Sequence, residues 1–346
     1  MKKNVVNRKQ RITIPSLLMM MLAFSSCGED KQNLPDRPEL FEEKIVIANR
    51  NSGSLSFIDA IDNSVTKTLK LPDSEPMYVV YVPKTDRLYV GDRATKKIHV
   101  INPANQEIET SINVGAGIFH MWADGQGKEL WVVNDMDNSI SVINLQTNAV
   151  TTTIAIDAKP HDIFITKDGS TAYVSIFTTD RDMDKVYKYA TSSYSKTAEI
   201  NVGKEPHLYA FGEDKLYVPC QSGQLYTLDA TSLEIISQKQ YEGAHGITGS
   251  ARKNALFVSN ITGGQLYSID PVTSDPFHEP VTTDNTPHNM VLNDEGDKMF
   301  VTHSGASANL VSIYSINAAQ AISYSTSVTV ENNPFGLTYY KRNINK

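Results

Sequence analysis

Histidine is the residue that recurs where this sequence could do chemistry. A short phrase returns along the chain at intervals of 38 to 47 residues: a polar turn, often a proline, one special residue and then an apolar strand. The special positions are Met77, His120, His161, His207, His245, His288 and Phe335. Neutral imidazoles bind transition metals and accept hydrogen bonds, so five of them gathered in one place would form a binding site.

The spacing of the phrases indicates the elements that must bring these residues together. A repeat of about 40 residues that contains four strand-like runs is typical of a β-propeller. The second run of each repeat is aromatic and β-branched, which favours a strand, at residues 88–90, 130–132, 172–174, 216–218, 256–258 and 299–301. If the repeats close into a ring, the seven special positions converge near its axis.

The two ends of the chain predict how the ring closes. Residues 45–47, 55–59 and 65–71 supply the second, third and fourth strands of a blade that lacks its first strand. Residues 335–340 form one further apolar strand, which would complete that blade. We therefore predict an all-β fold, a seven-bladed β-propeller at residues 44–346, whose shared blade removes open sheet edges.

The repeats resemble those of the YVTN, or YncE-like, propeller family. The best matches are residues 130–134 with 140–144 and residues 256–260 with 266–270, which follow the pattern Leu-Tyr-Val-x-Asn and then Val-x-Val-Ile-Asp. The resemblance covers roughly residues 44–340. It implies the fold but not an activity, because this scaffold carries unrelated functions.

The N-terminus predicts export and a lipid anchor. Residues 1–26 combine a basic start with a short apolar core, which is typical of a signal peptide. Cys27 follows Ser25 and Ser26, which resembles a bacterial lipoprotein cleavage site, although Phe24 stands where Leu is usual. Residues 27–43 then form a polar, lipidated tether, whose acidic start at 28–31 resembles a signal for the outer face of the outer membrane. An ordinary signal peptide and a merely solvated tether are the alternatives.

Charge and cysteine content exclude several classes of function. The net charge of −7 becomes −12 once the five positive charges of residues 1–26 are removed, so we expect no nucleic-acid binding. With Cys27 lipidated, Cys220 has no cysteine with which to pair, and we expect it to be a small buried side chain. No hydrolase elbow, zinc-protease motif or phosphate loop is present, so we predict no catalytic residues, no metal and no cofactor.

Antiparallel strand order places the special residues and the loops between the second and third strands on one face. The candidate ligand-binding residues are the seven special positions together with Arg93, Asn134, Phe177, Asn260 and His303. Convergent polar groups at a concave mouth favour a ligand site. Alternatively, each histidine could simply hydrogen-bond and order its preceding turn.

The predicted anchor and fold together resemble the cobalamin-binding surface lipoproteins of the BtuG type. This resemblance implies capture of a corrinoid and its transfer to a TonB-dependent outer-membrane transporter, with the membrane contacted through the lipid anchor only. A metal-dependent or redox enzyme that uses the histidine ring is one alternative. A scaffold that binds a partner protein or a glycan is the other.

Overall fold

The structure, a computed structural model, describes residues 40–212, 214–284 and 286–345. The predicted signal peptide, Cys27 and most of the predicted tether lie outside these residues. Within them the secondary structure consists of strands joined by turns, and no described segment forms a helix long and apolar enough to cross a bilayer.

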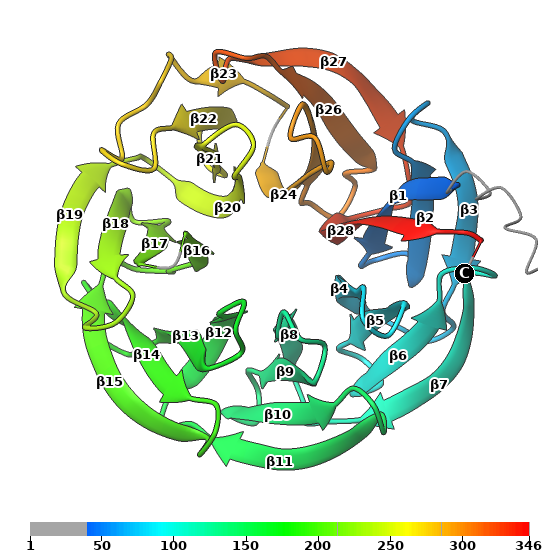
Figure 1. The fold of residues 1–346 in the computed structure, drawn as a ribbon, viewed down its shortest axis with the longest axis horizontal. Helices are drawn as coiled ribbons and strands as arrows, with labels where there is room; N and C mark the ends of the chain where they lie inside the picture. The colour runs from blue at the N-terminus through cyan, green and yellow to red at the C-terminus, as the bar shows by residue number, and fades with distance from the viewer. Residues whose placement is uncertain (1–39, 213, 285, 346) are drawn as a thin grey trace, which may run out of the picture. The chain divides into compact units, whose positions relative to one another are not determined.

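Seven four-stranded antiparallel sheets stand around a common centre like the blades of a propeller (Figure 1). From the inner to the outer strand, the blades are β28 (Pro334–Asn343), β1 (Phe41–Asn49), β2 (Ser54–Asp59) and β3 (Val65–Lys70); β4 (Pro76–Val82), β5 (Arg87–Asp92), β6 (Lys97–Asn102) and β7 (Glu107–Asn113); β8 (Ile118–Ala123), β9 (Glu129–Asn134), β10 (Ser139–Asn144) and β11 (Ala149–Ala155); β12 (Lys159–Ile165), β13 (Thr171–Phe177), β14 (Asp184–Ala190) and β15 (Ser195–Val202); β16 (Tyr209–Phe211), β17 (Lys215–Cys220), β18 (Gln224–Asp229) and β19 (Ile235–Gln240); β20 (Ala244–Ser250), β21 (Ala255–Asn260), β22 (Gln265–Ile269) and β23 (Val281–Thr282); and β24 (Pro287–Leu292), β25 (Lys298–His303), β26 (Leu310–Ile316) and β27 (Ile322–Thr329). The predicted seven-bladed fold is confirmed.

Burial explains the order of the strands within each blade. The second strands carry the aromatic and β-branched runs and are almost wholly buried, as Leu88, Tyr89 and Val90 in β5 show. Each such strand packs against neighbouring blades on both faces, which removes its apolar surface from water. The outer strands, such as β7, are largely exposed and accordingly rich in Thr, Glu and Lys. Cys220 is buried as predicted, and burial raises the pKa of its thiol.

The first and last strands of the described chain close the ring. The C-terminal strand β28 pairs antiparallel with β1, with Phe41 opposite Asn343 and Ile47 opposite Leu337. β1 begins at Phe41, three residues before the predicted start of the propeller at residue 44. Residues 41–43, predicted as tether, therefore belong to the sheet, because the long C-terminal strand offers them backbone partners.

A β-bulge interrupts six of the seven inner strands near their first residue. In β12, for example, Pro160 pairs with Ile176 and Ile163 pairs with Val174, so two residues of β12 lie opposite Ser175 alone. The same irregularity occurs in β4, β8, β20, β24 and β28. A bulge turns the side chains of its extra residues away from the regular alternation. In these six blades, two consecutive residues are thus available to the centre of the ring.

Candidate functional site

Two residues from each blade build the centre of the ring. We call the residues that directly follow the first paired residue of each inner strand the anchor layer: Met77, Phe119, His161, His207, His245, His288 and Phe335. His207 follows the isolated bridge between Pro206 and Cys220, in the one blade whose inner strand has no bulge. We call the second residues the inner layer: Tyr78, His120, Asp162, Leu208, Gly246, Asn289 and Gly336. Gly246 is required here, because a Cβ at this position would overlap the carbonyl oxygen of His288.

The layers correct the predicted alignment of the repeats at one blade. Ile118 pairs with Asn134 and Met121 with Val132, so Phe119, not His120, occupies the place that histidine holds in four other blades. His120 lies in the inner layer beside Asp162 and Asn289. Sequence analysis missed Phe119, Tyr78, Asp162 and Asn289. The signal for Asp162 and Asn289 was a polar residue directly after the special histidine in an otherwise apolar strand.

The five predicted histidines do meet at the axis. The ring centroids of His207 and His245 are 4.0 Å apart, those of His161 and His207 are 5.0 Å apart, and those of His120 and His207 are 5.4 Å apart. The aromatic ring of Phe335 lies next to this group, with its centroid 4.1 Å from that of His288. All five histidines are at most 9% exposed. We call these five residues the histidine cluster. Its side chains are buried and fill the centre of the propeller, whereas the sequence interpretation placed them around an open channel mouth.

Side chains cover the histidine cluster on the face where the inner strands begin, which we call the anchor face. Phe177 stacks on His161 with ring centroids 4.1 Å apart. Arg93 lies over Phe119 at 5.9 Å and forms an ion pair of 2.9 Å with Asp135. Of the predicted binding residues, Phe177 and Arg93 thus stand next to the cluster, as a cover. Met77 is fully buried and packs into an apolar core with Phe335.

Three other predicted binding residues have their side chains turned into their own loops or sheets. Asn134 is fully buried and donates to the hydroxyls of Ser139 and Ser141. Asn260 accepts from the amide of Gly263, and His303 lies 2.8 Å from the hydroxyl of Ser312. The sequence interpretation placed them at the mouth because they end second strands, but their hydrogen bonds order the turn or the sheet instead.

Asp162 organises the polar side of the cluster. Its carboxylate lies 2.9 Å from Nδ1 of His120 and 3.5 Å from Nδ1 of His207, and it accepts the backbone amide of Leu208. This leaves Nε2 of His120 and Nε2 of His207 buried without a hydrogen-bond partner. Both ring nitrogens of His245 are also unpartnered. The alternative interpretation was that each histidine hydrogen-bonds to the turn before it. The described hydrogen bonds of His120, His207 and His245 do not follow that pattern.

Burial keeps four of the five imidazoles of the histidine cluster neutral. It lowers the pKa of His120, although the nearby Asp162 carboxylate acts in the opposite direction. Burial, with neighbouring imidazoles, lowers the pKa of His161 and His245 well below the usual 6.5 and that of His288 to about 3. Burial alone would raise the pKa of Asp162, but the imidazoles of His120 and His207 outweigh it and hold that pKa low. At neutral pH the imidazoles of His120, His161, His245 and His288 are therefore uncharged, beside the carboxylate of Asp162.

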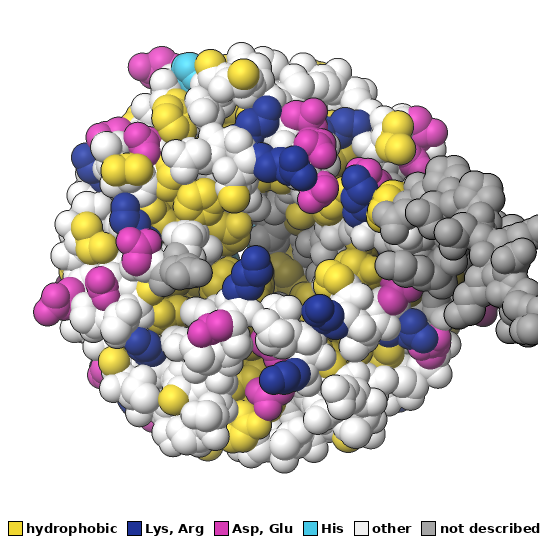
Figure 2. All heavy atoms as spheres, in the orientation of Figure 1, with side chains coloured by type: hydrophobic (Ala, Val, Ile, Leu, Met, Phe, Trp, Pro, Cys, Tyr) yellow, Lys and Arg dark blue, Asp and Glu magenta, His cyan; other side chains and the backbone are white. Residues whose placement is uncertain are grey.

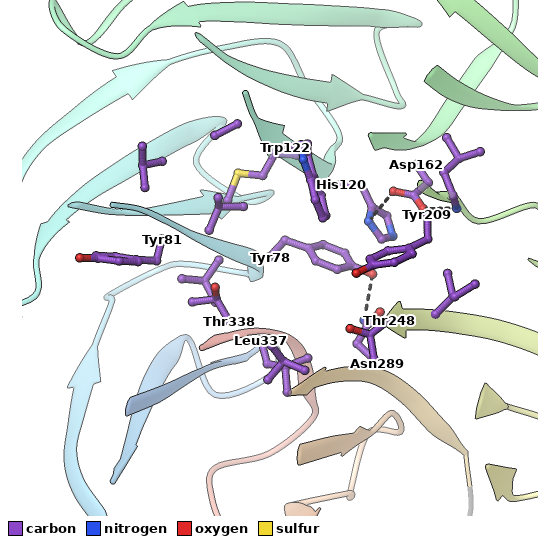
Figure 3. A pocket seen from close by; sticks show the side chains of 18 of the residues that line it. Tyr78, Tyr81, His120, Trp122, Asp162, Tyr209, Thr248, Asn289, Leu337 and Thr338 are labelled. Carbon is purple, nitrogen blue, oxygen red and sulfur yellow. Dashed lines mark hydrogen bonds and ion pairs between the residues drawn. The ribbon is translucent and has the colours of Figure 1, made fainter. Parts of the chain in front are cut away.

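A cavity of about 440 Å³ lies on the other side of the histidine cluster. Its floor is the inner layer, where the amide of Asn289 donates to the Tyr78 hydroxyl at 3.0 Å, and its walls include Trp122, Tyr209 and Leu337 (Figure 3). The cavity reaches the turns between first and second strands, at Pro83, Lys84, Asp124, Gly125 and Gly127. We call the face that carries these turns the hairpin face.

The central hollow of the ring is visible in the space-filling view, with hydrophobic side chains along its wall and Lys and Arg side chains around it (Figure 2). The sequence interpretation placed a ligand at the mouth on the anchor face. The structure instead opens its cavity toward the hairpin face, because Phe177, Arg93 and the histidine cluster fill the other end. The arrangement is a channel with one blind end, apolar walls and a polar floor.

Comparison with known proteins agrees with this architecture. Residues 73–214 match the family model of YNCE-like beta-propellers. The YNCE-like match runs from β4 through β16 and covers less than half of the chain. It includes four members of the inner layer, among them His120 and Asp162. None of the curated proteins matches this sequence.

Solved structures share the fold at low sequence identity. A putative 6-phosphogluconolactonase from Bacteroides fragilis is 15% identical with a TM-score of 0.67, over 86% of this chain and 98% of that one. Hydrazine synthase of Kuenenia stuttgartiensis is 14% identical with a TM-score of 0.64, over 80% and 92%. The dihydro-heme d1 dehydrogenase NirN, in complex with DHE, is 10% identical with a TM-score of 0.63, over 87% and 75%. At such identities the likeness shows the propeller fold alone.

Proposed function

We propose that this protein is a lipid-anchored binding protein of the outer-membrane surface, which captures a small ligand in the propeller channel and passes it to a TonB-dependent transporter. The observation that carries the proposal is the blind-ended channel. Its volume lies within the range of small-molecule pockets, and its apolar walls with a few convergent polar groups are typical of them. The basic and apolar start of the sequence followed by Cys27 supports export and anchoring.

A corrinoid is the first candidate ligand. It is bulky, amide-rich and partly apolar, so it could pack on Trp122 and Tyr209 while its amides meet Asn289 and the Tyr78 hydroxyl. A whole corrinoid is larger than a cavity of about 440 Å³. We therefore expect one end of the ligand to enter the channel while its macrocycle rests on the hairpin face, near Pro83 and Lys84.

Titration of the purified protein with cyanocobalamin, followed by calorimetry, tests the ligand and its face. We expect saturable binding of one equivalent, weakened about tenfold or more by Trp122→Ala, because losing a buried aromatic contact costs at least ~1.4 kcal/mol. Phe177→Ala is the matched control, since Phe177 is an aromatic residue near the axis on the anchor face. Absence of binding at micromolar protein would rule out a corrinoid as the ligand. A larger loss of affinity in Phe177→Ala than in Trp122→Ala would contradict binding at the hairpin face.

A further inference from the structure

Two buried histidine ring nitrogens beside the channel have no hydrogen-bond partner among the described residues. Nδ1 of His120 lies 2.9 Å from the Asp162 carboxylate, which accepts its proton, and Nε2 is left buried without a hydrogen-bond partner. His207 presents the same arrangement, with Nδ1 toward Asp162 and Nε2 unpartnered. Buried polar atoms usually have a partner, so these two nitrogens call for an occupant that the described residues do not supply.

A third imidazole completes a set of ligands. One ring nitrogen each from His120, His161 and His207 lies within 4.8 Å of the others. Around a tetrahedral metal with metal–nitrogen bonds of about 2.0–2.1 Å, ligand nitrogens stand about 3.3 Å apart. On metal binding the three nitrogens would therefore move together by up to about 1.5 Å. His120 and His207 also line the cavity, so a fourth coordination position can open toward the channel.

We propose that His120, His161 and His207 form a transition-metal site at the blind end of the channel. Asp162 is a positioning residue in it, because it accepts the Nδ1 protons and so directs Nε2 of His120 and of His207 at the metal. Metal-binding histidines usually donate their second ring nitrogen to a carboxylate in this way. The inference goes beyond ligand capture, since a metal could be held whether or not a corrinoid binds.

The chemistry of the donors selects the metal. Three imidazole nitrogens suit zinc and copper, whereas magnesium and calcium require oxygen donors. Among the described residues, Asp162 is the only carboxylate that contacts these rings. Three histidines with one position left open is an arrangement found in zinc sites that bind a water molecule or a substrate. Zn²⁺ is therefore the expected occupant, with Co²⁺ as its spectroscopic substitute.

Metal titration of the untagged full chain, after treatment with a chelator, tests the site. We expect calorimetry to show one tight equivalent of Zn²⁺, and Co²⁺ to give the visible absorption bands of a tetrahedral complex. His161→Phe and His207→Phe should each weaken Zn²⁺ binding at least ~100-fold, while Asp162→Asn should weaken it about 10–100-fold. His278→Ala is the control, because His278 is an exposed histidine in the connection between β22 and β23.

The variants are chosen to fold. Phe already stands in the anchor layer at Phe119 and Phe335, so His161→Phe and His207→Phe repeat a residue that this ring accommodates. The proposal would be overturned if the native chain did not bind one equivalent of Zn²⁺. It would also be overturned if Zn²⁺ binding were unchanged in both His161→Phe and His207→Phe. Cobalt bands in the native chain provide a readout that requires no variant. Failure of cyanocobalamin binding would leave these results unaffected, so the two proposals are tested separately.

Discussion

The free energy of unfolding should fall steeply as the pH is lowered from 7.5 to 5. Buried imidazoles are neutral in the folded protein but take up protons below a pKa of about 6.5 when the chain unfolds. Stability is therefore lost as the pH falls through 6.5 and keeps falling until the folded-state pKa is reached. For His288, whose pKa is about 3, the loss at pH 5 is about 2 kcal/mol. His120, His161 and His245 change stability in the same direction.

Urea unfolding of chelator-treated protein at pH 7.5, 6 and 5 measures this dependence. His288→Phe is the matched variant, because Phe335 and Phe119 occupy equivalent positions. It should lose about 2 kcal/mol less than the native chain between pH 7.5 and 5. Equal stability at pH 7.5 and 5 would show that the imidazoles are already solvated in the folded state.

Removal of the C-terminal strand should abolish cooperative folding of the propeller. A chain that ends at Asn333 lacks β28, which supplies the inner strand of one blade and pairs with β1 from Phe41 to Asn49. Its loss would remove Leu337 and so expose the edge of β1 and the apolar core that contains Ile45 and Ile47. An open edge of this kind favours aggregation over a ring with a missing strand.

Circular dichroism and thermal unfolding report the result. The truncated chain should show no sharp transition and should aggregate. A chain that lacks only residues 344–346 is the control, since it keeps all of β28. Its described losses include the hydrogen bonds from the Ile344 amide to the Leu40 carbonyl and from the Asn345 amide to the Asn343 side chain. A normal transition in the chain that ends at Asn333 would mean that the other six blades hold the fold without closure.

The fold was predictable because each blade repeats the same physical requirement. The buried second strands need runs such as residues 88–90 and 130–132, and these runs recur with the spacing of the blades. Composite closure was predictable for the same reason, since three strands at the N-terminus and one at the C-terminus add up to one blade. The start of β1 at Phe41 was missed, because residues 41–43 have no apolar pattern and pair only once β28 is present.

The details of the site could not be predicted, because a bulge leaves no reliable mark in the sequence. With regular alternation, only one residue per blade near the start of each inner strand faces the axis, so His120 was aligned with His161. The bulge brings a second residue to the axis, and a difference of one residue then places Phe119 in the anchor layer and His120 beside Asp162. The opening of the cavity toward the hairpin face depends on these same side-chain directions.

Carbethoxylation of histidine by diethyl pyrocarbonate, followed by mass spectrometry of the native protein over time, tests the buried convergence of the five histidines most directly. The structure predicts that the exposed His278 reacts first, and that His120, His161, His207, His245 and His288 become reactive only when the protein is unfolded in urea. Modification of these five residues at the rate of His278 in the folded protein would contradict the buried histidine cluster.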